Sequence, residues 1–396
     1  MILTAKQEQG LKIAVERYRN REAWTCIAGY AGTGKSTLIK FIISALDVNP
    51  EEEVCYVAFT GKAATVLQQK GCPNAITAHK LLYKAQPMPN GTYRFIPKTS
   101  LEGYKVIVVD EVSMLPKEMW NLLLSHGVYV LATGDPGQLP PVDPESNNGV
   151  LERPHVFLDE IMRQAQDSEI IRLSMWVREG KPLAQFPCAN EQVKIIKPEE
   201  IISGMYDWAD QILCATNDKR IDINNYVRQE RGFGKEPSIG DKVISLNNHW
   251  DYFSNQGVWA LTNGSIGTIT NYYKDPYYPP KYIYPDTLTY MYTDIELEDG
   301  DGFRGTPIDY KGLITGKPTL SGRQTFLLNK KKTEPDAPFY FAYAYAITCH
   351  KAQGSEWDKV LVFEEGYPYG FEDHKRWLYT AATRAKEKLV IVRNFR

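Results

Sequence analysis

The chain has 396 residues, and 46 lysines and arginines nearly balance 48 aspartates and glutamates, which gives a formal net charge of −2. The length predicts two or three domains, and a hydrophobic content of 43% suffices for ordinary globular cores. The charge balance excludes a globally basic protein, so a nucleic-acid partner would have to be held in a local groove.

Six cysteines are scattered along the chain, with no CxxC pair and no histidine-rich spacing. This pattern predicts neither a cysteine–histidine metal site nor a disulfide framework, and it is typical of core residues in a reducing compartment. The first 19 residues are amphipathic and charged, and no apolar run approaches the length of a membrane span. We therefore expect a soluble, intracellular protein that does not bind membranes.

The first predicted helix begins beside Thr4 and Gln7, which have the spacing of a capping box. In that arrangement the Gln7 amide satisfies a backbone group at the helix start. An alternative role for the same amide is to read the edge of an adenine ring. The local chemistry alone favours the cap.

Residues 29–36, GYAGTGKS, match the phosphate-binding loop pattern G-x-x-x-x-G-K-[ST] without a mismatch. A predicted buried strand at 24–28 precedes the loop and a predicted helix at 37–46 follows it, which is the context that the motif requires. The glycines let successive N–H groups turn toward a polyphosphate, and the helix start adds the positive end of its dipole. A chance match by a glycine-rich turn is the alternative, and the flanking elements argue against it.

This loop therefore predicts a nucleoside triphosphate site. Lys35 is expected to reach the β- and γ-phosphates, and the Ser36 hydroxyl is expected to ligate Mg²⁺. The predicted nucleotide-binding residues of the segment are Gly29, Ala31, Gly32, Thr33, Gly34, Lys35, Ser36 and Thr37.

Two further junctions between predicted strands and helices carry polar residues. A buried strand at 54–59 runs into Thr60 and Lys62, and a short helix that begins near residue 77 contains His79. Ligands of parallel sheets bind at the carboxyl ends of the strands, and these three side chains suit the phosphates of a nucleic-acid strand. Plain helix capping explains the junctions equally well.

Residues 87–98 interrupt the alternation of strands and helices. Asn90-Gly91 is a strong hairpin-turn signal, so we expect a hairpin insert at about residues 84–99. Its aromatic residues Tyr93 and Phe95 could wedge between bases or stack on them. Decoration packed on the protein surface is the other interpretation.

Two carboxylates end the predicted buried strand at 106–111. Asp110 is expected to hold Mg²⁺ through its water shell, and Glu111 is expected to orient or deprotonate the attacking water. A simple acidic turn fits poorly at this distance behind a phosphate loop. A third strand at 127–133 leads into GDPGQLPP, where Gln138 could report the presence of the γ-phosphate; a rigid structural turn is the alternative.

The motifs GYAGTGKST, AFTGKAA, TAHKLL, VVDEVSM and GDPGQLPPV resemble, in order and spacing, those of superfamily 1 DNA helicases, most of all the RecD and Dda branch. The later half continues the resemblance with LDEIMRQ at 158–164, ILCATN at 212–217, AITCHKAQGSE at 346–356 and LYTAATRA at 378–385. The resemblance covers nearly the whole chain except about residues 235–340.

The resemblance implies an α/β fold with two RecA-like P-loop NTPase domains, a small hairpin insert in the first and an SH3-like β-barrel insert in the second. The implied ranges are 1–165 for the first domain, 166–236 and 341–396 for the second, and 237–340 for the barrel. Short strands and turns from residue 241 onward agree with a barrel. The many tyrosines at 272–292 are interpreted as partly buried barrel residues, with base stacking as the alternative.

The resemblance also implies roles for single residues. It favours Gln7 as an adenine reader, and it makes Arg163 and Arg384 the two arginines that reach the transferring phosphoryl group. The residues implied to lie between the ATP cleft and the DNA channel are Gln353, Gly354 and Glu356, and those implied to face the strand are Thr348, His350 and Lys351.

The resulting expectation is a monomeric ATP- and Mg²⁺-dependent DNA helicase that moves 5′ to 3′ on single-stranded DNA and unwinds forked duplex DNA. Single-strand-binding or replication proteins are the expected protein partners. A translocase that displaces proteins without efficient unwinding is one alternative, and an ATP-gated nucleic-acid-binding protein is another. RNA as the track also stays open, because stacking and backbone contacts tolerate either sugar.

Overall fold

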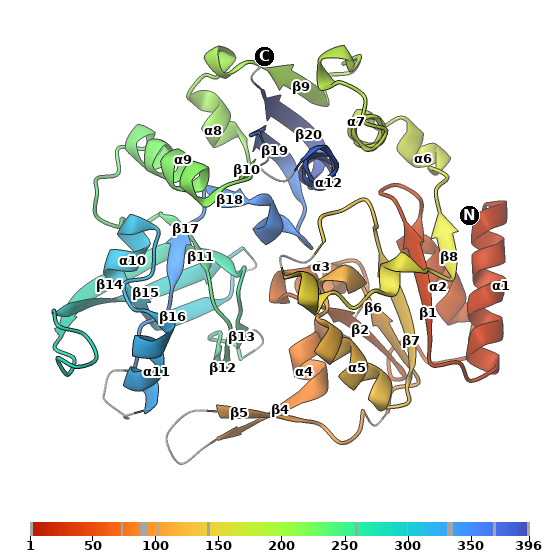
Figure 1. Cartoon of the computed structure of the whole chain (residues 1–396), viewed down its shortest axis with the longest axis horizontal. Coiled ribbons are helices and arrows are strands. Elements are labelled where there is room, and N and C mark those ends of the chain that lie inside the picture. Colours follow the sequence, from red (N-terminus) through yellow and green to blue (C-terminus); the bar gives the residue numbers. More distant parts are fainter. Residues whose placement is uncertain are drawn as a thin grey trace. The chain divides into compact units, whose positions relative to one another are not determined.

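The computed structural model describes residues 3–72, 74–87, 93–101, 103–140, 143–257, 260–298, 300–330, 336–366 and 370–393. The chain forms two compact units (Figure 1). Unit 1 consists of Met1–Tyr83, Pro97–Ala215 and Thr348–Arg396, and unit 2 consists of Lys84–Ile96 and Thr216–Ile347. In the described part of the chain, every helix is too short or too polar to cross a membrane.

The first sheet of unit 1 has six strands in the order β3-β2-β6-β7-β1-β8, and all neighbouring strands run parallel. Its strands are β1 (Trp24–Gly29), β2 (Val54–Ala58), β3 (Ala75–Thr77), β6 (Val106–Val109), β7 (Tyr129–Gly134) and β8 (Val156–Leu158). The helices of this region are α1 (Ala5–Arg19), α2 (Lys35–Ala45), α3 (Gly61–Gln69), α4 (Ala78–Leu82) and α5 (Lys117–Ser125), with 3₁₀ turns η1 (Val112–Met114), η2 (Pro144–Ser146) and η3 (Val150–Glu152). The strands expected from the sequence at 24–28, 54–59, 106–111 and 127–133 are confirmed as β1, β2, β6 and β7, with small shifts at their ends.

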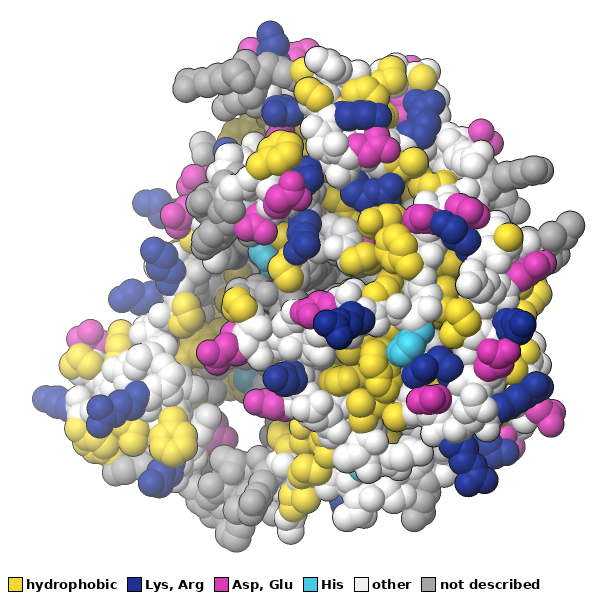
Figure 2. All heavy atoms as spheres, turned by 45° about the vertical axis from the view of Figure 1, so that its right-hand side comes forward, with side chains coloured by type: hydrophobic (Ala, Val, Ile, Leu, Met, Phe, Trp, Pro, Cys, Tyr) yellow, Lys and Arg dark blue, Asp and Glu magenta, His cyan; other side chains and the backbone are white. Residues whose placement is uncertain are grey.

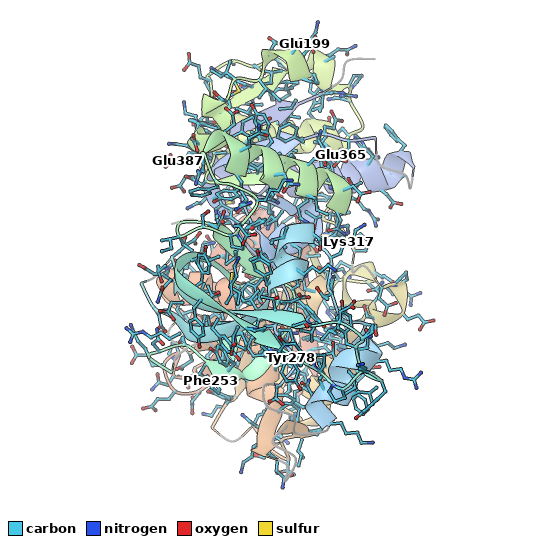
Figure 3. The ribbon with its side chains drawn as sticks, turned by 90° about the vertical axis from the view of Figure 1, so that its left-hand side faces the viewer. Glu199, Phe253, Tyr278, Lys317, Glu365 and Glu387 are labelled. Carbon is cyan, nitrogen blue, oxygen red and sulfur yellow. The ribbon has the colours of Figure 1, made fainter. Side chains whose placement is uncertain are left out.

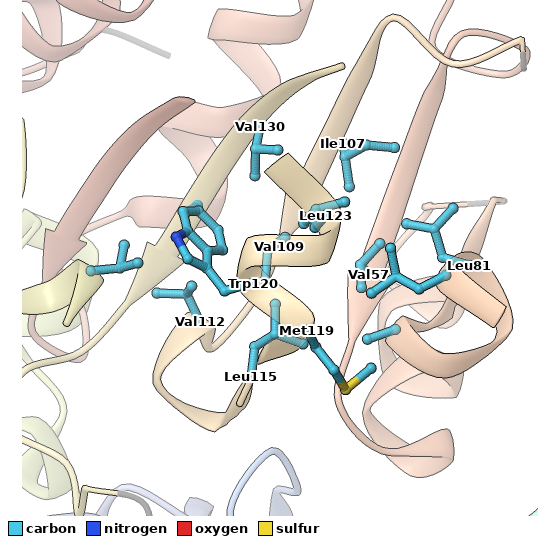
Figure 4. Close-up of a cluster of buried hydrophobic side chains, with 14 of the residues drawn as sticks. Val57, Leu81, Ile107, Val109, Val112, Leu115, Met119, Trp120, Leu123 and Val130 are labelled. Carbon is cyan, nitrogen blue, oxygen red and sulfur yellow. The ribbon is translucent and has the colours of Figure 1, made fainter. Parts of the chain in front are cut away.

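The central strands of this sheet are covered on both faces. Alternate residues of β6 point to opposite sides, so Val106 and Val108 join one hydrophobic cluster while Ile107 and Val109 join the other. Figure 4 shows the second cluster, in which Trp120 of α5 packs against the strands. This double coverage explains the continuous run of apolar residues that marked these strands in the sequence.

The second sheet of unit 1 combines distant parts of the chain. Its strands β10 (Gln211–Cys214), β19 (Trp357–Phe363), β20 (Ala385–Val392) and β9 (Val193–Ile196) lie side by side in that order and are parallel. Its helices are α6 (Arg163–Gln166), α7 (Glu169–Arg178), α8 (Gly204–Trp208) and α12 (Phe371–Ala382), with 3₁₀ turns η4 (Leu183–Gln185), η5 (Pro198–Glu200) and η6 (Cys349–Ala352). Helices α7 and α12 contact each other. In β18 (Ala346–Thr348) the chain passes from unit 2 into unit 1.

Unit 2 is built around an antiparallel sheet of five strands in the order β16-β15-β14-β11-β17. These strands are β11 (Lys242–Ser245), β14 (Ile266–Tyr277), β15 (Leu288–Leu297), β16 (Gly302–Asp309) and β17 (Phe341–Tyr343). Unit 2 also contains a two-stranded sheet of β12 (His249–Phe253) and β13 (Ala260–Leu261) and the helices α9 (Asn217–Glu230), α10 (Tyr310–Thr315) and α11 (Gly322–Lys330). A buried ion pair, Arg228 Nε to Asp241 Oδ1 at 2.8 Å, ties α9 to the segment that leads into β11.

The tyrosines at 272–292 divide into two groups. Tyr290 is fully buried in a cluster against which Tyr277, Tyr284 and Tyr292 pack, as the barrel interpretation expects. Tyr278, which follows β14 and is labelled in Figure 3, is 76% exposed; Tyr273 and Tyr282 are also exposed.

The expected hairpin region contains a two-stranded sheet formed by β4 (Tyr83–Pro87) and β5 (Tyr93–Pro97). The Asn90-Gly91 turn and the side chain of Tyr93 lie outside the described residues. Phe95, the other predicted aromatic contact, is half-buried.

The nearly balanced numbers of basic and acidic residues leave side chains of both signs on the surface (Figure 2). On the face in Figure 2, lysines and arginines lie interspersed with aspartates and glutamates among uncharged side chains. All six cysteines are free, and the described residues contain no group of three or more histidine, cysteine or acidic side chains placed to bind a metal.

Candidate nucleotide-binding site

The loop between β1 and α2 turns at two glycines with left-handed backbone, Gly32 with φ +77° and Gly34 with φ +80°. An added Cβ at Gly34 would lie 2.5 Å from Gln7 Nε2, so the Gln7 amide would have to shift. No side chain caps the first turn of α2, whose N-cap is Gly34. The first N–H groups of a helix have no partner within the helix. At an uncapped helix start such groups can bind phosphate.

Lys35, the first residue of α2, is held over the loop by backbone carbonyls. Its ammonium donates hydrogen bonds to Gly29 O at 2.7 Å and to Tyr30 O at 3.1 Å. The buried Thr33 hydroxyl donates to Tyr30 O at 2.8 Å. Hydrogen bonds within the loop therefore fix its conformation, and the Lys35 ammonium lies at the N-terminus of α2.

Gln7 has the capping role that its local chemistry predicts. Thr4 N–H donates to Gln7 Oε1 at 3.0 Å, and Gln7 N–H donates to Thr4 Oγ1 at 3.3 Å, which completes a capping box. The same side chain is 1% exposed, and its Nε2 donates to Thr33 O of the phosphate loop at 3.2 Å. Gln7 thus supports the loop, and adenine reading stays a prediction.

The two predicted carboxylates follow β6 directly. The Thr133 hydroxyl, from the neighbouring strand β7, donates to Asp110 Oδ1 at 2.9 Å and fixes that carboxylate. Glu111 adopts φ +49°, a left-handed conformation that costs a non-glycine residue energy and is concentrated at functional sites. Its Oε1 accepts a hydrogen bond from Gln138 Nε2 at 3.1 Å. Its Oε2 is buried and has no hydrogen-bond partner among the described residues.

The surroundings of Glu111 suit a base. Burial of the carboxyl group raises the pKa of Glu111, and the adjacent Asp110 raises it further. The cations Arg384 and Lys35 act in the opposite direction and lower this pKa. A carboxyl group with a raised pKa is a better proton acceptor near neutral pH than an ordinary glutamate.

The oxygen donors at this position fit a magnesium ion. Mg²⁺ in nucleotide sites takes one or two protein oxygens, with substrate phosphates and water supplying the rest. Ser36 lies at the start of α2 and Asp110 at the end of β6, and Thr133 already orients the Asp110 carboxylate. These two residues match that donor set.

Arg384 is buried at the junction of α12 and β20, and is held by its own neighbourhood. Its guanidinium donates to Thr380 O at 3.0 Å, to Ser355 O at 3.2 Å and to Thr383 Oγ1 at 3.2 Å. The positive charge of Arg384 lowers the pKa of the Glu111 carboxyl group. One of the two predicted arginines therefore lies within electrostatic reach of Glu111. The side chains of Arg163 and Lys62 lie outside the described residues.

The residues predicted to connect ATP and nucleic acid lie in unit 1 as well. Gln353 Nε2 donates to Leu139 O at 2.9 Å, so it contacts the loop that carries Gln138. Gly354 has φ +74°, and an added Cβ there would lie 3.3 Å from Ala63 Cβ of α3. Glu356 forms an exposed ion pair with Lys70 at 3.2 Å.

The residues predicted to contact nucleic acid include a helix cap and buried or partly exposed side chains. Thr60 is the N-cap of α3 and accepts a hydrogen bond from Ala63 N–H at 3.2 Å, which confirms the capping alternative. Burial lowers the pKa of His79 to about 4, so the imidazole is uncharged at neutral pH. Thr348 is buried, whereas His350 and Lys351 are partly exposed. Their contacts with nucleic acid stay predictions.

Four residues at this site were not singled out in the sequence: Asp135, Arg178, Tyr379 and Thr380. The Tyr379 hydroxyl accepts a hydrogen bond from Ala31 N–H, and the Thr380 hydroxyl accepts one from Leu139 N–H, both at 2.9 Å. Two motifs of the sequence contain three of them: LYTAATRA includes Tyr379 and Thr380, and GDPGQLPPV includes Asp135.

Two family models match the chain. A model described as an AAA domain matches residues 3–198, which include the first parallel sheet. A model described as a UvrD-like helicase C-terminal domain matches residues 343–392, which include α12 and Arg384. Both halves of the candidate site therefore fall within matched segments.

Curated relatives cover the same region. The ATP-dependent RecD2 DNA helicase of Deinococcus radiodurans is 26% identical over 385 residues, which are 91% of this chain and 46% of the relative. The ATP-dependent DNA helicase Dda of Enterobacteria phage T4 is 29% identical over 192 residues, which are 45% of this chain and 43% of the relative. The matched regions thus span somewhat less than half the length of these relatives.

A solved structure is similar in fold. The Bacteroides Pif1 structure bound to single-stranded DNA superimposes with a TM-score of 0.53 at 19% identity, covering 99% of this chain and 92% of that one. At this identity the likeness concerns the fold.

Proposed function

Because the chain belongs to the superfamily 1 helicases of the RecD, Pif1 and Dda branch, we propose that it is an ATP-hydrolysing motor that moves 5′ to 3′ on single-stranded DNA and unwinds forked duplexes. Its two parallel sheets are the cores of two RecA-like domains. Two matched relatives are named as ATP-dependent DNA helicases, and a structural neighbour holds single-stranded DNA, which supports the proposal.

One observation carries the proposal. Glu111, whose pKa is raised by burial, accepts a hydrogen bond from Gln138 and lies in the field of both Lys35 and Arg384. Lys35 belongs to the phosphate loop, whereas Arg384 follows α12 of the second sheet region. A buried carboxylate in the field of a loop cation and of an arginine from a distant segment is an arrangement that suits phosphoryl transfer to water.

The residues divide the chemistry among them. Lys35 and the N–H groups of residues 29–37 bind and orient the β- and γ-phosphates of ATP. Ser36 and Asp110 would hold Mg²⁺, which would neutralise phosphate charge. Glu111 accepts a proton from the attacking water while Gln138 orients the carboxylate. Arg384, together with Arg163, stabilises the charge on the transferring phosphoryl group.

The division into domains follows the helicase pattern in this proposal. Residues 1–165 form the first RecA-like domain, 166–236 and 341–396 form the second, and 237–340 form an SH3-like β-barrel insert. The antiparallel sheet of unit 2 supports the barrel, and the pairing of β4 with β5 supports a hairpin at about 84–99.

In this proposal, polar and aromatic side chains of the motifs contact the single-stranded DNA. The contacts proposed are those of Thr60, Lys62, His79, Tyr93, Phe95, Thr348, His350 and Lys351. Since the chain has a net charge of −2, these contacts are local and do not depend on the overall field. Single-strand-binding or replication proteins are the proposed protein partners, and the motor acts as a monomer.

Duplex substrates with one single-stranded tail test the function. We expect ATP hydrolysis to rise when single-stranded DNA is added, and strand displacement to occur from a 5′ tail and not from a 3′ tail. The Glu111→Gln variant is the control for contaminating activity. Displacement from the 3′ tail alone would reverse the polarity. DNA-stimulated hydrolysis that clears bound streptavidin from single strands but separates no duplex would identify a translocase, and a complete lack of hydrolysis would reject the motor.

A further inference from the structure

Tyr379 of α12 contacts the phosphate loop directly. Its hydroxyl accepts a hydrogen bond from Ala31 N–H at 2.9 Å and donates one to Asp135 Oδ2 at 2.6 Å. The other oxygen of that carboxylate, Oδ1, accepts from Gly137 N–H at 2.8 Å. Tyr379 is 1% and Asp135 2% exposed. One hydroxyl therefore joins the loop that would hold phosphate to the loop that carries Gln138.

A second contact reaches the neighbouring residue of the phosphate loop. The guanidinium of Arg178, the last residue of α7, lies over the Tyr30 ring at 3.6 Å from its centroid. Two consecutive residues of the phosphate loop, Tyr30 and Ala31, are thus held by α7 and α12. These two helices also contact each other.

Helix α12 also contacts the loop of residues 134–139 at a second point. The Thr380 hydroxyl accepts a hydrogen bond from Leu139 N–H at 2.9 Å. At Gly137 an added Cβ would lie 3.1 Å from the Tyr379 ring and 3.4 Å from the Tyr30 ring, so this loop packs closely against both rings.

We infer that Tyr379 is a positioning residue that couples the phosphate loop and the Gln138 loop to Arg384 through α12. This inference rests on the proposed function. Thr380, the next residue of α12, binds the Arg384 guanidinium through its carbonyl oxygen, so a displacement of Tyr379 is passed to the arginine within one turn of helix. The hydroxyl itself does not touch the reacting atoms. Its role is to place the arginine and the glutamine at the same time.

The chemistry of the hydroxyl supports a fixed link. Burial and the nearby Asp135 raise the pKa of Tyr379 well above its ordinary value, so the phenol stays protonated and remains a donor. A phenol offers one donor and acceptor lone pairs, and both functions are used here. A buried network of hydrogen bonds holds its side chains in one of a few discrete arrangements. A residue that couples two loops needs this property, because both loops then change position together.

The variant Tyr379→Phe removes one oxygen and tests the link, with Tyr129→Phe as a matched control. Tyr129 is also buried in unit 1, and its hydroxyl is hydrogen-bonded to Thr25 Oγ1 at 2.6 Å, away from the phosphate loop. In Tyr379→Phe we expect kcat for DNA-stimulated ATP hydrolysis to fall about tenfold or more while Kd for ATP changes less than about threefold. Tyr129→Phe should leave both values unchanged. Equal losses of affinity and kcat in Tyr379→Phe would overturn the positioning role.

A double-mutant cycle separates coupling from general loosening. If Tyr379 acts through the arginine, the kcat loss of Tyr379→Phe should largely disappear in an Arg384→Ala background. Multiplicative losses in the double variant would show that the two residues act independently and would overturn the inference.

Hydrogen exchange of the phosphate loop tests the link without any hydrolysis. Peptides that cover residues 27–36 should exchange faster in Tyr379→Phe than in the wild type, with Tyr129→Phe unchanged. Unaltered exchange of these peptides would refute the link whether or not the protein hydrolyses ATP. Faster exchange in a wild-type protein that proves inactive would support the link and reject only the proposed motor function.

Discussion

Gln138 and Glu111 are joined by a hydrogen bond of 3.1 Å from the side-chain amide to Oε1 of the carboxylate. The two residues come from different strand ends, β6 and β7, and are 27 positions apart in the chain. Because helix α12 holds the Gln138 loop at Leu139 N–H, the orientation of the proposed base depends on a helix of the second sheet region. Motion of that helix is therefore expected to change the rate of hydrolysis.

Replacement of Glu111 by glutamine should remove the base and keep the shape. We expect Glu111→Gln to bind ATP with near wild-type affinity while kcat falls by about 10²–10⁴-fold, the range typical of general base catalysis. Glu118→Gln, at an exposed glutamate of α5, is the control and should be active. Single-turnover hydrolysis measures the effect, and wild-type turnover in Glu111→Gln would remove this residue from the mechanism.

The same substitution should stabilise the fold at neutral pH. Since the pKa of Glu111 is raised in the folded state, its carboxyl group contributes stability when protonated at low pH and loses that contribution as pH rises through the folded-state pKa. Glutamine is neutral at every pH, so Glu111→Gln should have a higher Tm than the wild type at pH 7. The difference should vanish below about pH 4, where the wild-type carboxyl group is also neutral. Differential scanning calorimetry at the two pH values measures it, and a lower Tm at pH 7 would contradict the burial argument.

Removal of Arg384 should move the acid limb of the pH–rate profile upward. The guanidinium lowers the pKa of Glu111, so its loss leaves the carboxyl group harder to ionise. We expect the residual hydrolysis of Arg384→Gln to decline at a higher pH than that of the wild type, besides a lower kcat. Lys40→Ala removes an exposed cation from α2 and serves as the control. An unshifted acid limb would mean that Arg384 and Glu111 do not interact.

The loop lysine should be needed for both binding and turnover. Lys35→Ala removes the ammonium that Gly29 O and Tyr30 O hold above the loop. We expect hydrolysis to be abolished and Kd for ATP to rise by about tenfold or more, since one charge-assisted contact contributes about 1.5–3 kcal/mol. Fluorescent-nucleotide titration gives the affinity, again with Lys40→Ala as the control. Tight binding and full turnover in Lys35→Ala would exclude residues 29–36 as the phosphate site.

A side chain at Gly34, the N-cap of α2, should lower the stability of the protein. Gly34→Ala places a Cβ against Gln7 Nε2 and forces alanine into a left-handed backbone. The matched control is Gly71→Ala, because Gly71 has φ +87° but no atom within 4 Å of an added Cβ. The backbone cost of about 1–2 kcal/mol is common to both variants, so the extra loss of stability in Gly34→Ala measures the steric clash. Equal urea midpoints for the two variants would show that Gln7 yields without cost.

Local sequence determined the nucleotide loop and the strands that carry its partners. The pattern of residues 29–36 and the buried runs at β1, β2, β6 and β7 depend on backbone conformation and hydrophobic periodicity within a few residues. The same short range explains why the sequence predicts the capping box of Thr4 and Gln7 and offers capping as a role for Thr60. The charge state of His79 could not be read locally, because it depends on how much water the folded chain removes from the ring.

Tertiary structure alone decided which side chains meet at the loop. Tyr379 and Ala31 are 348 positions apart, and their hydrogen bond depends on the packing of α12, which no periodicity of either segment encodes. The raised pKa of Glu111 likewise comes from desolvation and from charges that distant segments supply. The sequence specified the groups that can bind phosphate, and the tertiary structure determined which side chains surround them. Contacts between distant segments are fixed by the packing of whole helices and strands and not by the local pattern of residues.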